Sequence, residues 1–214
     1  MRSHRKGDPK NEVLLGFDVR ELWVPLSEQW PPSRLQMYCL HEVTSKPLST
    51  DHLVWPSVFE IVSSECHPNA GFSGRLWTSL SEMLACFKRL KIDREAQAIA
   101  IALVWDSHAS NNSTMWSSLM LPTAPEKVDP AWLFLGYDVS DQWLLSGLLN
   151  CGYSRNERQM LQAHWSSKLN DSHLLRNRRD ALRFIQVCNA RVPEHAPFFA
   201  YAIYAIGTGY ADDS

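Results

Sequence analysis

The sequence predicts an α+β fold: a single domain with an antiparallel or mixed sheet and helices packed on one side. Apolar residues alternate with other residues in the segments 13–20, 98–105 and 132–139, which is typical of strands. They recur at three- and four-residue steps in 76–90 and 174–188, which is typical of amphipathic helices. The chain has 214 residues, 45% of them hydrophobic, so it is long enough to bury a substantial core.

The domain organisation follows from composition. Residues 1–11 are rich in charge and are expected to form a flexible N-terminus, and residues 12–214 are expected to form the domain. Residues 107–130 are rich in Ser, Asn, Thr and Pro and are interpreted as a long surface connection. A domain boundary within 107–130 is the alternative to a single domain.

The strands are expected in chain order at five places. The first is 13–20. Its apolar positions Val13, Leu15, Phe17 and Val19 alternate with Leu14, Gly16, Asp18 and Arg20. Weaker signals predict strands at 35–43 and 58–62. The segment 98–105 is apolar on both faces, so it is expected to be central in the sheet. The last of the five is 132–139.

The helices are expected to begin at small polar residues that can cap them. Ser73 is the candidate cap of the helix that carries the apolar positions of 76–90, and Asp171 or Ser172 is the candidate cap of the helix over 174–188. The segment 197–206 is apolar at most positions. Its alanines favour a helix and its aromatic residues and isoleucines favour a strand; we interpret it as a helix.

One short pattern occurs twice in the chain. Leu-Gly-Phe-Asp-Val at 15–19, followed by Trp23, matches Leu-Gly-Tyr-Asp-Val at 135–139, followed by Trp143. The two alternatives are a duplicated half of the protein and a coincidence between short segments.

Charge excludes some classes of partner. The formal net charge is −2, so no excess of basic residues indicates nucleic-acid binding, and no stretch is apolar for long enough to span a membrane. Residues 106–150 hold five acids and one base, Lys127. A basic cluster on the helix at 174–188 could pair with these acids or bind an anion; it comprises Arg176, Arg178, Arg179 and Arg183.

Cysteines and histidines give no metal or redox motif. The five cysteines include no CxxC pair, as expected for thiols of a reducing compartment, and we therefore expect a cytoplasmic protein. His164, Asp171 and His173 are close in sequence, but a role in packing and capping is the favoured interpretation. The sequence predicts neither a metal site nor a cofactor.

Asp138 and Asp141 are the candidates for acid–base chemistry. Two carboxylates three residues apart at the end of a strand could serve catalysis or bind magnesium. The alternatives are that Asp141 caps a helix, that Asp138 forms a turn, or that both belong to an acidic contact patch. Cys66 lies beside His67, but adjacent side chains in an extended segment point apart, so the two cannot form a nucleophile–base pair. No catalytic residue is assigned.

Two segments carry a resemblance to a known group of proteins. These are 132–153, with its run Phe-Leu-Gly-Tyr-Asp-Val and the later Leu-Leu-Ser-Gly-Leu-Leu-Asn-Cys-Gly-Tyr, and 192–199, Val-Pro-Glu-His-Ala-Pro-Phe-Phe. Both resemble uncharacterised bacterial proteins of the kind found as immunity partners of polymorphic and contact-dependent toxins.

The resemblance implies an immunity protein that binds a cognate toxin domain, blocks its active site and serves in bacterial competition. Acids and tryptophans would supply steering and anchoring at the contact. The candidate partner-binding residues are Asp138, Asp141, Trp143, Asp106, Trp116, Glu126 and Asp129. The alternative is a small hydrolase or nuclease that uses Asp138 and Asp141, or Cys66.

Overall fold

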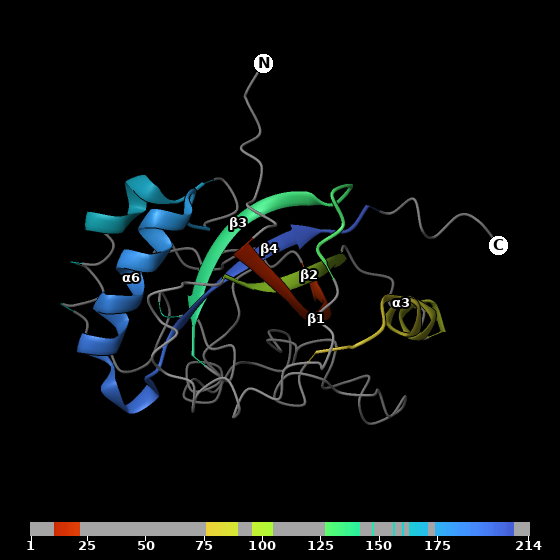
Figure 1. Cartoon of the computed structure of the whole chain (residues 1–214), viewed down its shortest axis with the longest axis horizontal. Coiled ribbons are helices and arrows are strands. Elements are labelled where there is room, and N and C mark those ends of the chain that lie inside the picture. The colour runs from red at the N-terminus through yellow and green to blue at the C-terminus, as the bar shows by residue number, and fades with distance from the viewer. Residues whose placement is uncertain are drawn as a thin grey trace, which may run out of the picture. The chain divides into compact units, whose positions relative to one another are not determined.

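The computed structural model contains a four-stranded antiparallel sheet together with helices, which confirms a mixed α+β fold (Figure 1). The hydrogen-bonded order of the strands is β1-β2-β4-β3. The structure describes residues 11–21, 76–89, 96–104, 127–141, 147, 156, 160, 163–170 and 174–207. The strands predicted at 35–43 and 58–62 lie outside these residues.

Three of the predicted strands are confirmed and one predicted helix is wrong. The strands are β1 (Glu12–Glu21), β2 (Ala96–Val104), β3 (Leu133–Ser140) and β4 (Phe199–Ala205). β2 is an interior strand of the order, as its two apolar faces predicted. The segment predicted as a helix at 197–206 instead forms β4. It is also interior and buried at nearly every position, so no alternation remains to distinguish it from a buried helix.

Both long helices are confirmed, but each begins later than predicted. The helical segments are α3 (Leu80–Arg89), α6 (Arg178–Arg191) and the short 3-10 turns η5 (Ser166–Lys168) and η6 (Pro193–His195). The apolar residues just before α3 and α6 belong to β-bridges rather than to the helices. Because these residues are apolar, the helical pattern in the sequence begins before the first residue of each helix.

The described residues form two compact units. The strands β3 and β4 are each divided between them, after Leu135 and after Tyr201. The first unit comprises residues 11–21, 76–89, 96–104, 127–135 and 202–207. The second unit comprises residues 136–141, 147, 156, 160, 163–170 and 174–201. Most of the possible boundary at 107–130 lies outside the described residues, and its end at 127–130 belongs to the first unit.

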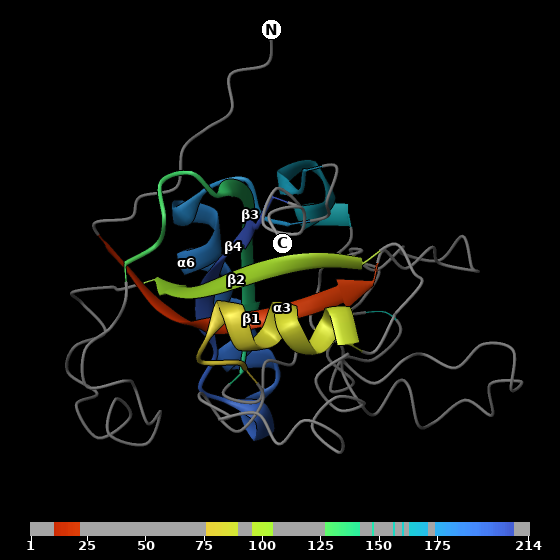
Figure 2. The same cartoon turned by 90° about the vertical axis from the view of Figure 1, so that its right-hand side faces the viewer.

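The first unit is built on the antiparallel pair β1 and β2, with α3 alongside β1 (Figure 2). The register shifts by one residue between Leu14 and Gly16, which is a β-bulge. Gly16 has a φ of 156°, and a Cβ there would lie 2.5 Å from the carbonyl oxygen of Trp77. Glycine therefore allows the strand to approach the segment that leads into α3.

A buried acid of the first unit is paired with a buried tyrosine. Tyr204 donates its hydroxyl hydrogen bond to the carboxylate of Glu12, and both residues are buried. The ring of Phe134 lies 5.4 Å from that of Tyr204, measured between centroids. A carboxylate in the core is thus matched with a donor, as burial requires.

The second unit is centred on α6. Phe184 is fully buried on this helix, and its ring lies 4.8 Å from the ring of Trp165. The ammonium group of Lys168 lies 4.3 Å from the centroid of Trp165, which is a cation–π contact. These contacts fasten the helix to the segment that contains η5.

The start of α6 is held by a local hydrogen-bond network. The side chain of Asn177 accepts a hydrogen bond from the backbone N–H of Asp180 at 2.9 Å and donates one to its carboxylate at 2.7 Å. Lys168 donates to the same carboxylate at 3.4 Å. Burial alone raises the pKa of Asp180, but the hydrogen bonds and cationic charge outweigh it, so its pKa lies below the ordinary value of 3.8.

We expect the stability of the protein to depend on pH through Asp180. Because the folded state holds its pKa below the ordinary value, the stabilisation is present above about pH 4 and is lost as the pH falls through the lowered value. The melting temperature of the wild type should therefore decrease more steeply between pH 4 and pH 2 than that of Asp180→Asn. Parallel curves for the two proteins in circular dichroism melts would contradict this expectation.

Candidate functional site

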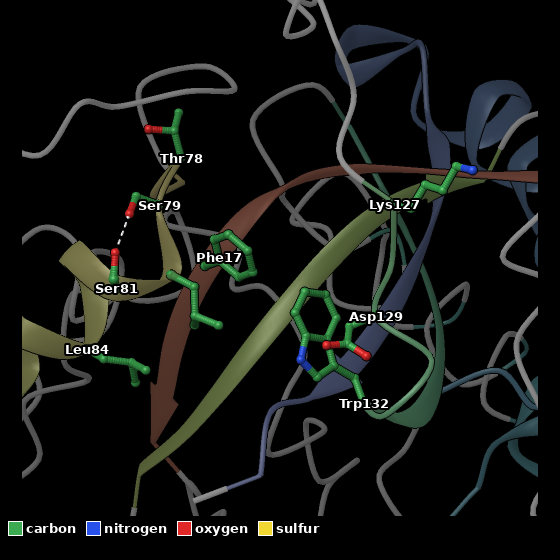
Figure 3. Close-up of a pocket in the computed structure, with 9 residues that line it drawn as sticks. Phe17, Thr78, Ser79, Ser81, Leu84, Lys127, Asp129 and Trp132 are labelled. Carbon is green, nitrogen blue, oxygen red and sulfur yellow. Dashed lines mark hydrogen bonds between the residues drawn. The ribbon is translucent and has the colours of Figure 1, made fainter. Parts of the chain in front are cut away.

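A hollow of about 680 Å³ lies in the first unit beside the start of α3 (Figure 3). Residues 78–81 and Leu84 line it from the side of the helix, and Phe17, Lys127, Asp129 and Trp132 line the rest. It lies where β1, the start of α3 and the segment before β3 meet. We refer to it below as the α3 pocket.

Aromatic side chains line part of the α3 pocket. The rings of Phe17 and Trp132 meet edge to face, with centroids 5.7 Å apart and an interplanar angle of 86°. Phe17 is itself fixed, because its backbone N–H and C=O both bond to Trp77 at 2.9 Å. The indole N–H of Trp132 is buried and has no hydrogen-bond partner among the described residues. Such a donor is costly to leave unsatisfied.

Polar groups line the remainder of the α3 pocket. The hydroxyl oxygens of Ser79 and Ser81 lie 2.9 Å apart, and Ser79 also accepts a hydrogen bond from the backbone of Glu82 at 3.3 Å. Lys127 is exposed, and Asp129 is half-buried. One carboxylate oxygen of Asp129 accepts from the backbone N–H of Ala131 at 2.8 Å, so this acid also forms a turn. The pocket combines hydroxyls, one acid, one base and an aromatic wall.

Asp138 and Asp141 are both fully buried in the second unit. Asp138 accepts the backbone N–H of Val139 at 2.8 Å and the hydroxyl of Ser140 at 3.3 Å. Asp138 therefore lies within β3 rather than forming a turn. The prediction that these two acids belong to an exposed contact patch is wrong, because their carboxylates are directed into the protein and receive hydrogen bonds there.

The other predicted partner-binding residues divide into two groups. Asp129 is described and lines the α3 pocket. The rest lie outside the described residues, as does Cys66; they are Asp106, Trp116, Glu126 and Trp143. Gln142, where Asp141 was predicted to cap a helix, also lies outside them.

Asp141 is joined to a histidine from a distant part of the chain. The Nδ1 atom of His195 lies 3.2 Å from a carboxylate oxygen of Asp141, and the side chain of His195 is 20% exposed. The hydroxyl of Tyr201 donates to the backbone carbonyl of Asp141 at 3.2 Å. Burial, followed by the charges of Asp141 and Asp138, raises the pKa of Tyr201 well above 10.0, so its hydroxyl keeps its proton.

This arrangement holds a histidine ring by a buried carboxylate, the geometry in which an aspartate orients an imidazole. The contact between Asp141 and His195 could not be predicted from the sequence, because the two residues are 54 positions apart. Within the described residues, no group of three or more His, Cys, Asp or Glu side chains is placed to hold a metal ion.

Comparison of the chain with protein families, curated proteins and solved structures finds no match. None of the helices in the described ranges combines the length and apolar character that a membrane crossing requires.

Proposed function

We propose that the protein is an immunity protein that binds a bacterial toxin domain and blocks its active site. The observation that carries the proposal is the α3 pocket, whose lining includes one base, one acid and one tryptophan in Lys127, Asp129 and Trp132. Tryptophan is enriched among the anchoring residues of protein–protein contacts, and charged groups around it can steer a partner of complementary charge. The resemblance of 132–153 to immunity proteins includes Trp132 and gives the class of partner.

The rest of the proposal concerns setting and architecture. We propose that the protein acts in the cytoplasm, where it needs no cofactor and contacts neither nucleic acid nor membrane. We also propose a single domain with its helices on one side of the sheet.

The test is protection of cells from a toxin. The proposal expects a gene for a toxin domain beside this gene. Cells that express this toxin domain should grow when the protein is co-expressed, and continued killing would contradict the proposal. With purified proteins, Lys127→Glu and Trp132→Ala should each raise the dissociation constant of the complex with the toxin domain by about tenfold or more. Met160→Ala is the matched control, because Met160 is 68% exposed and lies in the other unit. Equal binding by all variants would exclude the α3 pocket as the contact.

The alternative, a small hydrolase or nuclease, has one observation in its favour. His195 is partly exposed and is held by the carboxylate of Asp141, so it could act as a general base. Asp138 has both oxygens engaged and is buried, which makes it a supporting group rather than a nucleophile. Loss of a measured hydrolytic activity in His195→Gln, with Tm unchanged, would favour this alternative.

A further inference from the structure

The same local structure occurs in the described part of each unit. In the first unit, Phe17 of β1 forms an antiparallel bridge with Trp77 through two backbone hydrogen bonds of 2.9 Å. In the second unit, Tyr137 of β3 forms an antiparallel bridge with Leu175 through two backbone hydrogen bonds of 2.9 and 2.8 Å. Each bridge follows a glycine with positive φ in the repeated sequence pattern.

Each bridge leads into a helix by the same step. Ser79 and Asn177, both two residues after the bridge, cap α3 and α6. Each accepts the backbone N–H of an acidic residue three positions later, Glu82 in one case and Asp180 in the other. A position on α3 therefore corresponds to the position 98 residues later on α6, as Ser79 does to Asn177.

The burial of most corresponding positions agrees, although Glu82 is exposed and Asp180 is buried. Leu76 and Leu174, directly before the bridging residues, are both fully buried, and so are Met83 and Ala181 on the helices. Three corresponding positions are exposed in both units. They are Thr78, Ser81 and Ala85 in the first unit, and Arg176, Arg179 and Arg183 in the second.

The first unit shows that this local structure does not require arginine at the three exposed positions, because there it forms with Thr, Ser and Ala. In the second unit the arginines on the helix oppose its stability. Arg179 lies in the first turn of α6, near the positive end of the helix dipole, where cations are unfavourable. Arg179 and Arg183 are four residues apart on the helix, which places like charges next to each other.

The three arginines are not neutralised within the described part of the chain. None of Arg176, Arg179 and Arg183 has an ion pair there. Asp180, which follows Arg179 in the sequence, is buried and bonded to Lys168 and Asn177; the charge of Arg179 lowers the pKa of Asp180 without an ion-pair contact. The predicted pairing of this cluster with the acidic segment of the chain is therefore not observed among the described residues.

We propose that the arginine face at the start of α6, formed by Arg176 just before the helix and by Arg179 and Arg183 on it, is an interaction surface for an acidic patch on a protein partner. Arg179 and Arg183 are about 6 Å apart along the helix, at 1.5 Å per residue. Guanidinium groups bind carboxylates through paired hydrogen bonds. Tight nucleic-acid binding uses about six or more phosphate contacts, and this chain of net charge −2 offers three arginines on this face. The proposal does not depend on the α3 pocket or on a toxin partner.

The first unit supplies the test variant. R176T/R179S/R183A gives the second unit the residues that the first unit carries at the corresponding positions. Binding of a fluorescein-labelled peptide of ten glutamates, measured by anisotropy in low salt, should weaken by about tenfold or more. The melting temperature should stay equal or increase, because repulsion and the unfavourable dipole contact are removed. R176K/R179K/R183K should bind more weakly than the wild type but more tightly than R176T/R179S/R183A, because it keeps the charge and loses the paired hydrogen bonds.

The matched control removes the same charge elsewhere. R2T/R5S/K6A also removes three positive charges, from the N-terminal segment, and should bind the peptide within about twofold of the wild type. Equal weakening by both triple variants would overturn the proposal, because binding would then depend on net charge alone. No measurable peptide binding by the wild type, or tighter binding of a 12-base-pair DNA duplex, would also overturn it. So would unfolding of R176T/R179S/R183A, with single Arg183→Ala binding like the wild type.

Discussion

Gly16→Ala is expected to lower the free energy of unfolding by about 3 kcal/mol or more, with Gly136→Ala causing a comparable loss. Gly16 and Gly136 have φ values of 156° and 148°, which residues with a Cβ rarely adopt. A Cβ at Gly16 would lie 2.5 Å from the Trp77 carbonyl oxygen, and one at Gly136 would lie 2.6 Å from the Cβ of Leu174. The obstructing atoms are backbone or the first side-chain carbon, so no flexible side chain can move away.

Urea unfolding followed by circular dichroism measures this effect, and Gly207→Ala is the matched control. Gly207 is exposed, and a Cβ at this position would meet no atom within 4 Å, so its substitution should change stability by less than about 0.5 kcal/mol. If Gly16→Ala were no more destabilising than Gly207→Ala, the close approach of β1 to Trp77 would not exist in solution. The same comparison with Gly136→Ala tests the bridge of the second unit.

Strands and helices with a clear apolar period could be predicted from the sequence. β1 was located by the alternation of its large apolar residues, although the strand is buried on both faces from Leu14 to Asp18, and α3 carries apolar residues at helical spacing. β4 could not be predicted in this way, because it is buried at almost every position and a fully apolar segment has no period. The first residue of each helix could not be predicted either, because apolar residues such as Leu76 precede a β-bridge and not the helix itself.

The contacts of the candidate site could not be predicted from the composition of the chain. Nothing in the sequence distinguishes an exposed aspartate from a buried one, and Asp141 is buried because Tyr201 and His195 reach it from distant parts of the chain. The contact between Phe17 and Trp132 likewise joins segments 115 positions apart. By contrast, the repeated Leu-Gly-aromatic-Asp-Val pattern marks a real structural repeat, because the local backbone requires a glycine and buries the residue that follows it.

Phe184→Ala is expected to be the most damaging single substitution in the second unit, with a loss of about 3–5 kcal/mol. Phe184 is fully buried on α6, and its ring lies against that of Trp165. Its removal leaves a cavity beneath the helix and also exposes Trp165, which in turn contacts the ammonium group of Lys168. Because Lys168 also bonds Asp180, the loss should extend to the capped start of α6.

The matched control is Met160→Ala, since Met160 is a large apolar residue of the same unit but is 68% exposed. Its substitution should cost less than about 1 kcal/mol in urea unfolding. Phe184→Ala should also weaken binding of the acidic peptide, because the arginine face depends on an ordered α6. R176T/R179S/R183A should weaken that binding without the loss of stability. A Phe184→Ala protein as stable as Met160→Ala would mean that α6 is not anchored through this residue.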